Sequence, residues 1–401
     1  MEQIYVPEDP NLVEVPVFSL EVGMFVAELD RPWLETPFAM QGFVVKDDAD
    51  IEYISKHCTY VYVDPEKREG FGIKMPRQVK AVKEQSTLKA EFSRAKVEFE
   101  SASQAMERVF AQIEQNQKVD IPTMQKVVRP LIDSVFRNRE ALAALVRLKD
   151  KGDYMFQHSL ATAVWAAVLG RHMGLERAAL EDLALGVSVM DVGMTDVPDE
   201  ILNKKGPLEP HEIVEMRAHV SNSLKLVHNN GLTNRVMNLV ACHHERFDGS
   251  GYPQRLKGNE IPPLARIAGI VDTYDAMLTP RPHSRARSSF EAIQELADMK
   301  DRGFQGSLVE QFIQTVGMFP TGSIVELNTG AVGVVVEQNP ARRLKPKVVL
   351  ILDENKQRYN KLSLIDLSAV ASWTKLQLPE MWIVQEHSRG SFDIQPDDYF
   401  I

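Results

Sequence analysis

The chain has 401 residues, of which 44% are hydrophobic and 25% charged, so it is long enough for two or three globular domains. Its 46 basic and 56 acidic side chains give a formal net charge of −10, which argues against non-specific binding of duplex nucleic acid. The two cysteines form no CxxC pair, no apolar run is long enough to span a bilayer, and no secretory signal is visible. We therefore expect a cytoplasmic protein.

Residues 1–75 are predicted to form a small strand-rich domain. Valines alternate with other residues over 13–17, a β-branched run occupies 43–45, and Tyr and Val alternate over 60–63. Alternation with a period of two, interrupted by Gly and Pro, is typical of short strands.

The next segment, 76–124, is predicted to be a long helix with a linker. It has no Gly or Pro from 78 to 117, and its apolar side chains recur at helical spacing. These side chains are Leu88, Phe92, Ala95, Phe99, Ala102, Met106 and Phe110. The stripe indicates either a helix that covers its own domain or the seam of a homodimer through the 78–117 helix, and the sequence leaves both open.

Residues 125–318 are predicted to form a helical domain, because one helical pattern follows another with Gly and Pro between them. Residues 319–401 turn back to β-rich runs, for example at 332–336 and 348–352, and are predicted to form a small β appendage and a tail. The expected fold class is therefore mainly α, with small β-containing units at both ends.

The most informative chemical pattern is the pair His243 and His244, which ends a predicted helix and precedes a glycine-rich loop. Both side chains flank the apolar face of that helix. A buried imidazole needs a partner, and two adjacent ones often find it in a shared cation. A lone His on such a face is usually a hydrogen-bonded core residue, whereas the pair favours metal ligands.

Further candidate ligands lie on apolar helix faces elsewhere in the same region. They are His158, Asp191, His219 and Asp272, with Asp275 one helical turn after Asp272. A buried carboxylate without a partner is costly, so each Asp implies a nearby cation. Imidazole and carboxylate together suit Fe, Mn or Zn. By contrast, His172, His211 and His228 are expected at solvent-facing or loop positions.

The window from His243 to Pro253 reads HHERFDGSGYP, and it resembles the HD-GYP family pattern HHExxDGxGYP at every named position. Short stretches within 197–204, 256–267 and 272–282 also resemble that family. The resemblance covers roughly 125–318. Residues 20–26 are similar, more weakly, to a small domain that often precedes HD-GYP domains.

This resemblance implies a helical bundle of the HD superfamily that hydrolyses cyclic di-GMP to pGpG and then GMP with two or three metal ions, commonly iron or manganese. Carried over by position, one ion takes Asp191, His219, His243 and His244, of which Asp191, His243 and His244 are the expected catalytic residues. A second ion takes His158, Asp191 and Asp272, with Asp191 bridging. Arg281 is expected to contact a phosphate, and Gly251, Tyr252 and Pro253 to shape the substrate pocket.

The chain departs from the family at positions that matter for this chemistry. Met190 stands where the family has a metal-binding His, and Met194 where it has a phosphate-binding Lys. Tyr154 replaces a Glu that binds a third metal, and Ser284 aligns with a Lys. A thioether is a poor substitute for imidazole at a hard or borderline cation, so one site is complete and the other is weakened.

Two hypotheses follow. The first is a cyclic di-GMP phosphodiesterase that works through a reduced metal site with one or two ions. The second is a catalytically inactive module that binds the nucleotide or a protein partner, for instance a GGDEF-domain cyclase.

Overall fold

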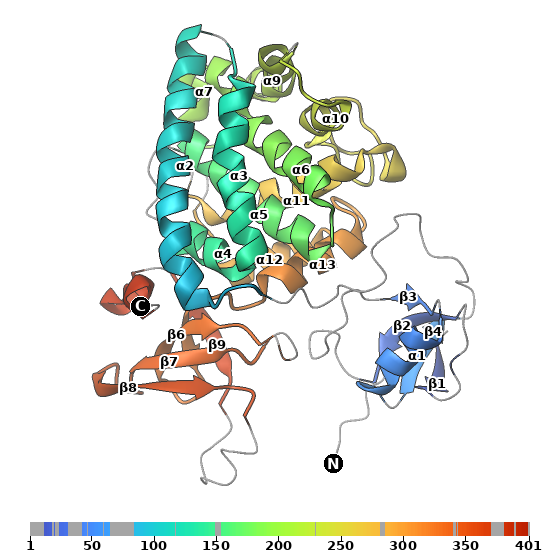
Figure 1. Cartoon of the computed structure of the whole chain (residues 1–401), viewed down its shortest axis with the longest axis vertical. Coiled ribbons are helices and arrows are strands. Elements are labelled where there is room, and N and C mark those ends of the chain that lie inside the picture. The colour runs from blue at the N-terminus through green and yellow to red at the C-terminus, as the bar shows by residue number, and fades with distance from the viewer. Residues whose placement is uncertain are drawn as a thin grey trace.

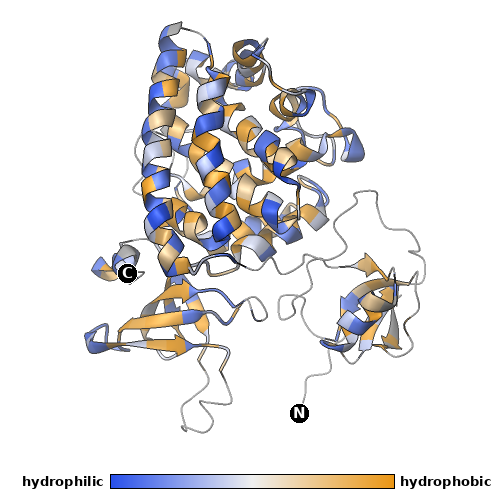
Figure 2. Cartoon of the chain, viewed as in Figure 1, coloured by the Kyte–Doolittle hydropathy of each residue, from blue (hydrophilic) through white to orange (hydrophobic). Residues whose placement is uncertain are grey.

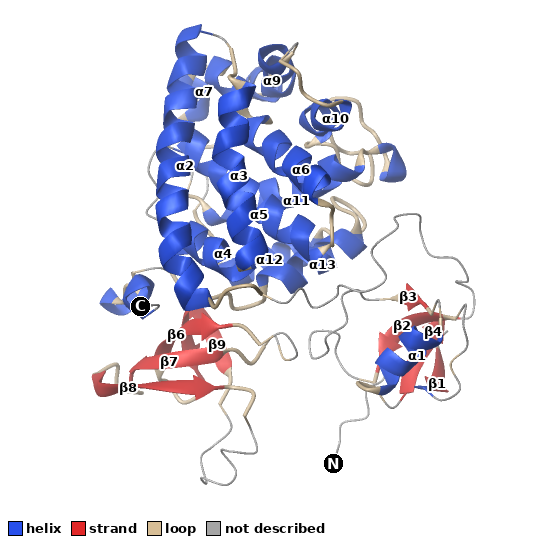
Figure 3. Cartoon of the chain, viewed as in Figure 1, coloured by secondary structure: helices blue, strands red, loops and turns tan. Residues whose placement is uncertain are grey.

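The structure is a computed structural model. It describes residues 12–17, 20, 24–30, 42–45, 47–58, 60–64, 84–116, 118–148, 154–228, 230–280, 285–339, 342, 344–369, 381–388 and 390–399. The predicted fold class is confirmed, because the chain is mainly helical, with a four-stranded sheet near one end and a five-stranded sheet near the other (Figure 3). Among the described residues, none of the helices has both the length and the apolar character needed to cross a membrane.

The N-terminal sheet is antiparallel, with strand order β1-β4-β2-β3. Its strands are β1 (Val13–Pro16), β2 (Phe25–Leu29), β3 (Phe43–Val44) and β4 (Tyr60–Asp64). A short helix that the sequence analysis did not predict, α1 (Asp48–Ser55), lies between β3 and β4 in the chain. It begins after Asp47, whose side chain accepts a hydrogen bond from the Asp50 backbone N–H at 3.1 Å. Ile54 of this helix is buried in the core of the sheet.

The first helices of the large body are α2 (Leu88–Asn116), α3 (Ile121–Arg137), α4 (Arg139–Leu148), α5 (Tyr154–His172) and α6 (Arg177–Val189) (Figure 1). The long helix α2 contacts α3, α4 and α5. Six of the seven apolar residues of its predicted stripe are buried there, and Leu88 packs partly against the same core. The apolar stripe of α2 therefore covers the helical domain of its own chain. These side chains are not available as the seam of a homodimer.

The remaining helices of the body carry the candidate site. They are α7 (Asp199–Leu202), α8 (Pro210–Arg217), α9 (His219–Val227), α10 (Asn234–Cys242), α11 (Pro263–Leu278), α12 (Ser289–Asp298) and α13 (Gly306–Val316). Near the centre, the ring of Trp165 on α5 meets that of Tyr274 on α11 edge-on at 5.4 Å, and Tyr274 meets Phe312 on α13 at 4.9 Å. This aromatic packing holds α5 against α11, the two helices that carry His158 and Asp272.

The C-terminal sheet has the order β8-β7-β6-β5-β9, and each neighbouring pair is antiparallel. Its strands are β5 (Ile324–Leu327), β6 (Val332–Glu337), β7 (Lys347–Leu352), β8 (Arg358–Asp366) and β9 (Ile383–His387). The inner strands are largely hydrophobic (Figure 2), as the β-rich runs predicted. Strands β8 and β9, which the sequence analysis did not single out, form the two edges. The Phe290 backbone N–H donates to Glu386 of β9 at 2.8 Å, which joins the sheet to α12.

Candidate metal centre

Asp191 lies in the turn between α6 and a short 3-10 helix, η3 (Val192–Asp196). Gly193 allows η3 to pack closely on α9, because a Cβ at this position would lie 2.3 Å from both the His219 carbonyl oxygen and the Ser223 nitrogen. The Gly193 N–H donates to Ser223 Oγ at 2.8 Å. This contact places Asp191 beside the first residue of α9, which is His219.

His219 is the first residue of α9, which follows α8 after the single residue Ala218. The His219 Nδ1 lies 2.6 Å from the Met216 carbonyl oxygen, so Nδ1 is the donor in that pair. The other ring nitrogen, Nε2, lies 3.3 Å from Asp191 Oδ1. Because Nδ1 is bonded to that carbonyl, Nε2 is the ring nitrogen that faces Asp191 and is available to a metal ion.

The pair His243 and His244 follows the last residue of α10. His243 Nδ1 donates to the Val240 carbonyl at 2.9 Å, and its Nε2 lies 3.4 Å from Asp191 Oδ1. His243 is completely buried, yet its Nε2 has no hydrogen-bond partner. His244 Nε2 lies 3.1 Å from His219 Nε2. One ligand atom from each of Asp191, His219, His243 and His244 lies within 4.8 Å of the other three, which is a set that could hold a metal ion.

A second set consists of His158, Asp191 and Asp272, whose ligand atoms also lie within 4.8 Å of one another. His158 Nε2 is 3.0 Å from Asp272 Oδ1 and 3.9 Å from Asp191 Oδ2. Asp191 therefore directs one oxygen toward each set. Asp275, one turn beyond Asp272 on α11, lies 2.7 Å from His158 Nδ1 and orients that ring.

Burial and hydrogen bonding give these groups unusual proton affinities. Burial alone raises the pKa of Asp191, but the adjacent His219 and His243 imidazoles outweigh it and hold that pKa well below its usual value. Burial, and then the nearby His243, lower the pKa of His244 well below that of an ordinary imidazole. An ionised carboxylate and a neutral imidazole are the forms that bind metals.

His158 behaves in the opposite way. Burial lowers its pKa, but hydrogen bonds to Asp272 and Asp275 raise it more, to about 10. Without a cation in the second set, His158 is therefore an imidazolium near neutral pH. A metal ion at this position replaces that positive charge.

Met190 and Met194, which replace family His and Lys residues, add no nitrogen ligand to either of the two candidate metal-binding sets. Met190 caps α6, is completely buried and belongs to the main hydrophobic core. Met194 lies half-buried in η3. Tyr154 begins α5, but its side chain lies outside the described residues, as do Arg281 and Ser284.

The loop after the His pair is fixed against it. Gly251 must be glycine, because a Cβ there would lie 2.3 Å from the Arg246 nitrogen. The Tyr252 ring stacks on that of His244 at 4.7 Å with an interplanar angle of 21°, and the peptide bond between Tyr252 and Pro253 is cis. The loop thus places Gly251, Tyr252 and Pro253 next to the four-ligand set.

Two residues that the sequence analysis did not single out also belong to this region. Buried Glu245 accepts hydrogen bonds from the Gln254 and Leu256 backbone N–H groups at 2.7 and 3.0 Å, which closes the loop. Arg217 places its guanidinium over the Tyr252 ring at 4.6 Å. Glu245 is part of the matched HHExxDGxGYP pattern, whereas no sequence signal marks Arg217.

The prediction for His172 was wrong. It is only 5% exposed, and its Nδ1 lies 3.2 Å from Arg139 Nη1. Its neighbours Arg171 and Met173 are buried as well, so this end of α5 lies inside the helical body. The predictions for His211 and His228 are confirmed, because both side chains are exposed.

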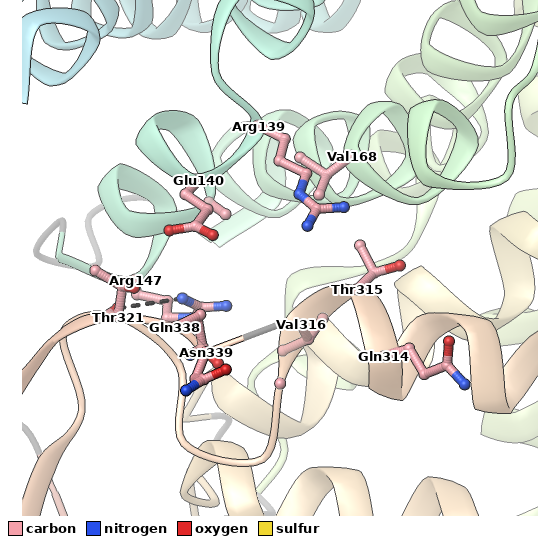
Figure 4. Close-up of a pocket in the computed structure, with 12 residues that line it drawn as sticks. Arg139, Glu140, Arg147, Val168, Gln314, Thr315, Val316, Thr321, Gln338 and Asn339 are labelled. Carbon is pink, nitrogen blue, oxygen red and sulfur yellow. Dashed lines mark hydrogen bonds between the residues drawn. The ribbon is translucent and has the colours of Figure 1, made fainter. Parts of the chain in front are cut away.

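A separate pocket lies where α4, α5 and α13 meet the segments around β5 and β6 (Figure 4). Arg139 and Glu140 line it from α4, and Arg147 Nη1 donates to the Thr321 carbonyl oxygen across it at 3.2 Å. None of the candidate metal ligands lines this pocket. Its charged groups join the helical body to the C-terminal sheet.

The fold and the site thus define a helical protein with a cluster of His and Asp side chains suited to a metal ion. A family model described as HD domain matches residues 133–308. A domain of unknown function matches 12–123, and a KOW domain associated with HD domain matches 324–373. The chain thus contains an HD domain, as its resemblance to HD-GYP proteins implied, and an additional N-terminal domain.

Three relatives carry names that describe an activity. A protein of Pseudomonas aeruginosa named cyclic di-GMP phosphodiesterase is 29% identical over 95% of this chain and 98% of its own length. A cyclic di-GMP phosphodiesterase of Thermotoga maritima is 28% identical over 45% of this chain and 50% of its own length. A cyclic di-GMP phosphodiesterase response regulator of Xanthomonas campestris is 30% identical over 50% of this chain and 55% of its own length. The chain spans about half the length of the last two.

Proposed function

We propose that this chain is a cyclic di-GMP phosphodiesterase of reduced turnover, built on one complete metal site and one incomplete one. The observation that carries the proposal is the completely buried His243 Nε2, which has no hydrogen-bond partner and lies 3.4 Å from the ionised Asp191. Such an atom is costly unless a cation binds it. The names of the relatives support the choice of substrate.

In this proposal, Asp191, His219, His243 and His244 hold the first ion, and iron or manganese suits that set of three imidazoles and one carboxylate. When bound, the metal supplies an activated water and stabilises charge on the phosphate oxygens. The protein orients the ligands. The carbonyls of Met216 and Val240 hold His219 and His243 in the tautomer whose Nε2 is free.

The second ion has only His158, Asp191 and Asp272, because Met190 stands where the resemblance places an imidazole. The loss of a direct ligand should cost at least as much as the roughly 10–100-fold loss that follows from removing a hydrogen-bonded supporting group. Two-metal phosphoryl chemistry needs both ions to stabilise the attacking and leaving oxygens. We therefore expect product to form, through pGpG to GMP, at a lower rate than in a relative with both sites intact.

The test is metal analysis and product analysis on the full chain purified under low oxygen. Metal content near one ion per chain, with pGpG formed in the presence of iron or manganese, supports the proposal. His243→Ala should abolish both metal binding and pGpG formation. His211→Ala, at an exposed imidazole that is not among the candidate ligands, is the matched control and should change neither. Absence of pGpG with both metals would overturn the phosphodiesterase proposal.

A second candidate function, a non-catalytic module that binds cyclic di-GMP or a partner such as a GGDEF-domain cyclase, is favoured by the core packing of Met190. Its completely buried thioether fills apolar volume instead of presenting a nitrogen. Binding of cyclic di-GMP without any turnover, unchanged by His243→Ala, would support this function over the first.

A further inference from the structure

We propose that Arg217 is a specificity-determining residue that binds the second, non-scissile phosphate of the cyclic dinucleotide. The proposal rests on the proposed function. It starts from a stack of three side chains: the Tyr252 ring lies 4.7 Å from the His244 ring, and the Arg217 guanidinium lies 4.6 Å from the same Tyr252 ring. The Tyr252 ring therefore contacts both a candidate metal ligand, His244, and the Arg217 guanidinium.

The chain between Arg217 and the metal ligands is short and fixed. Arg217 is the last residue of α8, and His219 is the first residue of α9. Only Ala218, whose backbone is helical, separates them, so Arg217 over Tyr252 is held close in the chain to His219, whose Nε2 lies 3.3 Å from Asp191 Oδ1. This coupling gives the guanidinium a defined position relative to the ligand set.

The charge of Arg217 is available to a ligand. Its side chain is exposed, and in the part of the chain that the structure describes no carboxylate lies within ion-pair distance of it. The helix dipole of α8 favours a basic residue in its last turn, which explains why an arginine occurs at position 217. The dipole does not explain why the Arg217 guanidinium lies over the Tyr252 ring. Stacked on a ring, a guanidinium keeps its N–H donors in one plane, which suits a phosphate.

The position of the stack decides which phosphate is bound. In the proposed function, the scissile phosphodiester lies at the metal ligands, and His244 is one of them. Among the described residues, the Arg217 guanidinium contacts the Tyr252 ring, and no hydrogen bond or ion pair joins it to His244 or to another candidate ligand. A group at the metal is therefore beyond its reach, whereas the second phosphate of a cyclic dinucleotide extends away from the metal. A simple phosphodiester, with one phosphate, has nothing at that position.

The experiment compares two substrates on the full, metal-loaded chain: cyclic di-GMP, and bis(p-nitrophenyl) phosphate as a probe with one phosphate. Arg217→Met should raise KM, and the Kd measured by equilibrium dialysis, for cyclic di-GMP by roughly tenfold or more, the loss expected for a charged hydrogen bond. It should leave kcat nearly unchanged, because the contact is equal in the ground and transition states. Hydrolysis of bis(p-nitrophenyl) phosphate and the metal content should not change.

Arg217→Lys should give an intermediate loss, because it keeps the charge but not the planar group. Arg235→Met, at an exposed arginine on α10, is the control and should behave as wild type. Unchanged cyclic di-GMP affinity in Arg217→Met, with wild type binding normally, overturns this inference alone. An equal loss on both substrates also overturns it. No binding and no turnover by wild type overturns the proposed function together with it.

Discussion

His158 and Asp275 are joined across two helices, with the His158 Nδ1 2.7 Å from the Asp275 carboxylate. The other ring nitrogen, Nε2, lies 3.0 Å from Asp272, one turn earlier on α11. Asp275 thus orients the His158 ring, whose Nε2 lies near both Asp272 and Asp191. The sequence analysis named Asp275 only for its place one turn after Asp272, and this contact gives it the role of orienting a candidate ligand.

Asp275→Asn should weaken metal binding at the second set by roughly 10–100-fold without removing a ligand, since the amide orients His158 less strongly than a carboxylate. Calorimetric titration of metal-free protein with Mn²⁺ would measure it. Asp298→Asn, at an exposed position on α12, is the matched control. Equal manganese affinities in Asp275→Asn and wild type would contradict the orienting role.

Met190→His should add the missing ligand and raise both the metal content, toward two ions per chain, and the rate of pGpG formation. Met190 is completely buried, so an imidazole there is destabilising unless a cation binds it. Thermal unfolding of the variant should therefore respond to added manganese more than that of wild type. Met190→Leu keeps the apolar volume and is the control. A variant with wild-type metal content and wild-type turnover would show that position 190 does not determine the activity.

Much of the fold follows from local patterns in the sequence. The heptad-like stripe of α2 and the valine runs of β6 and β7 are periodic, and periodicity records which face is buried. Short elements without such a pattern were not predicted. The helix α1 depends on its Asp47 cap, and the edge strand β9 on pairing with β5, which is far from it in the sequence.

The candidate ligands could be named from the sequence because each one interrupts an apolar face or matches a motif. Arg217 could not, because it lies on the exposed helix α8, and its contact with the Tyr252 ring joins residues that are far apart in the chain. His172 was misjudged for a related reason. Its burial depends on Arg139 and other groups that are distant in the chain.

Glu245→Ala should loosen the loop that carries Gly251 and Tyr252, because the Glu245 carboxylate accepts two backbone N–H bonds in a buried position. Hydrogen bonds to a charged group contribute about 1.5–3 kcal/mol each, so the free energy of unfolding should fall by at least that amount. Urea denaturation measures the loss, and KM for cyclic di-GMP should rise in parallel. Glu245→Gln keeps one acceptor oxygen and should lose less. Unchanged stability in the alanine variant would contradict this role.

Metal binding at the second set should strengthen as pH rises. The pKa of His158 is raised to about 10 in the metal-free chain by hydrogen bonds to Asp272 and Asp275 that outweigh the effect of burial. Below that pH the imidazole carries a proton that the metal must displace, so affinity increases with pH, and about one proton is released per ion throughout the range well below pH 10. Manganese titrations between pH 6.5 and 8.5 in a weakly buffered indicator solution would measure both the affinity and the proton release.

Asp275→Asn removes one of the groups that raise the His158 pKa, so the manganese affinity of this variant should depend less steeply on pH than that of wild type. Manganese affinity that stays constant over this range would show that His158 is already neutral before the ion binds.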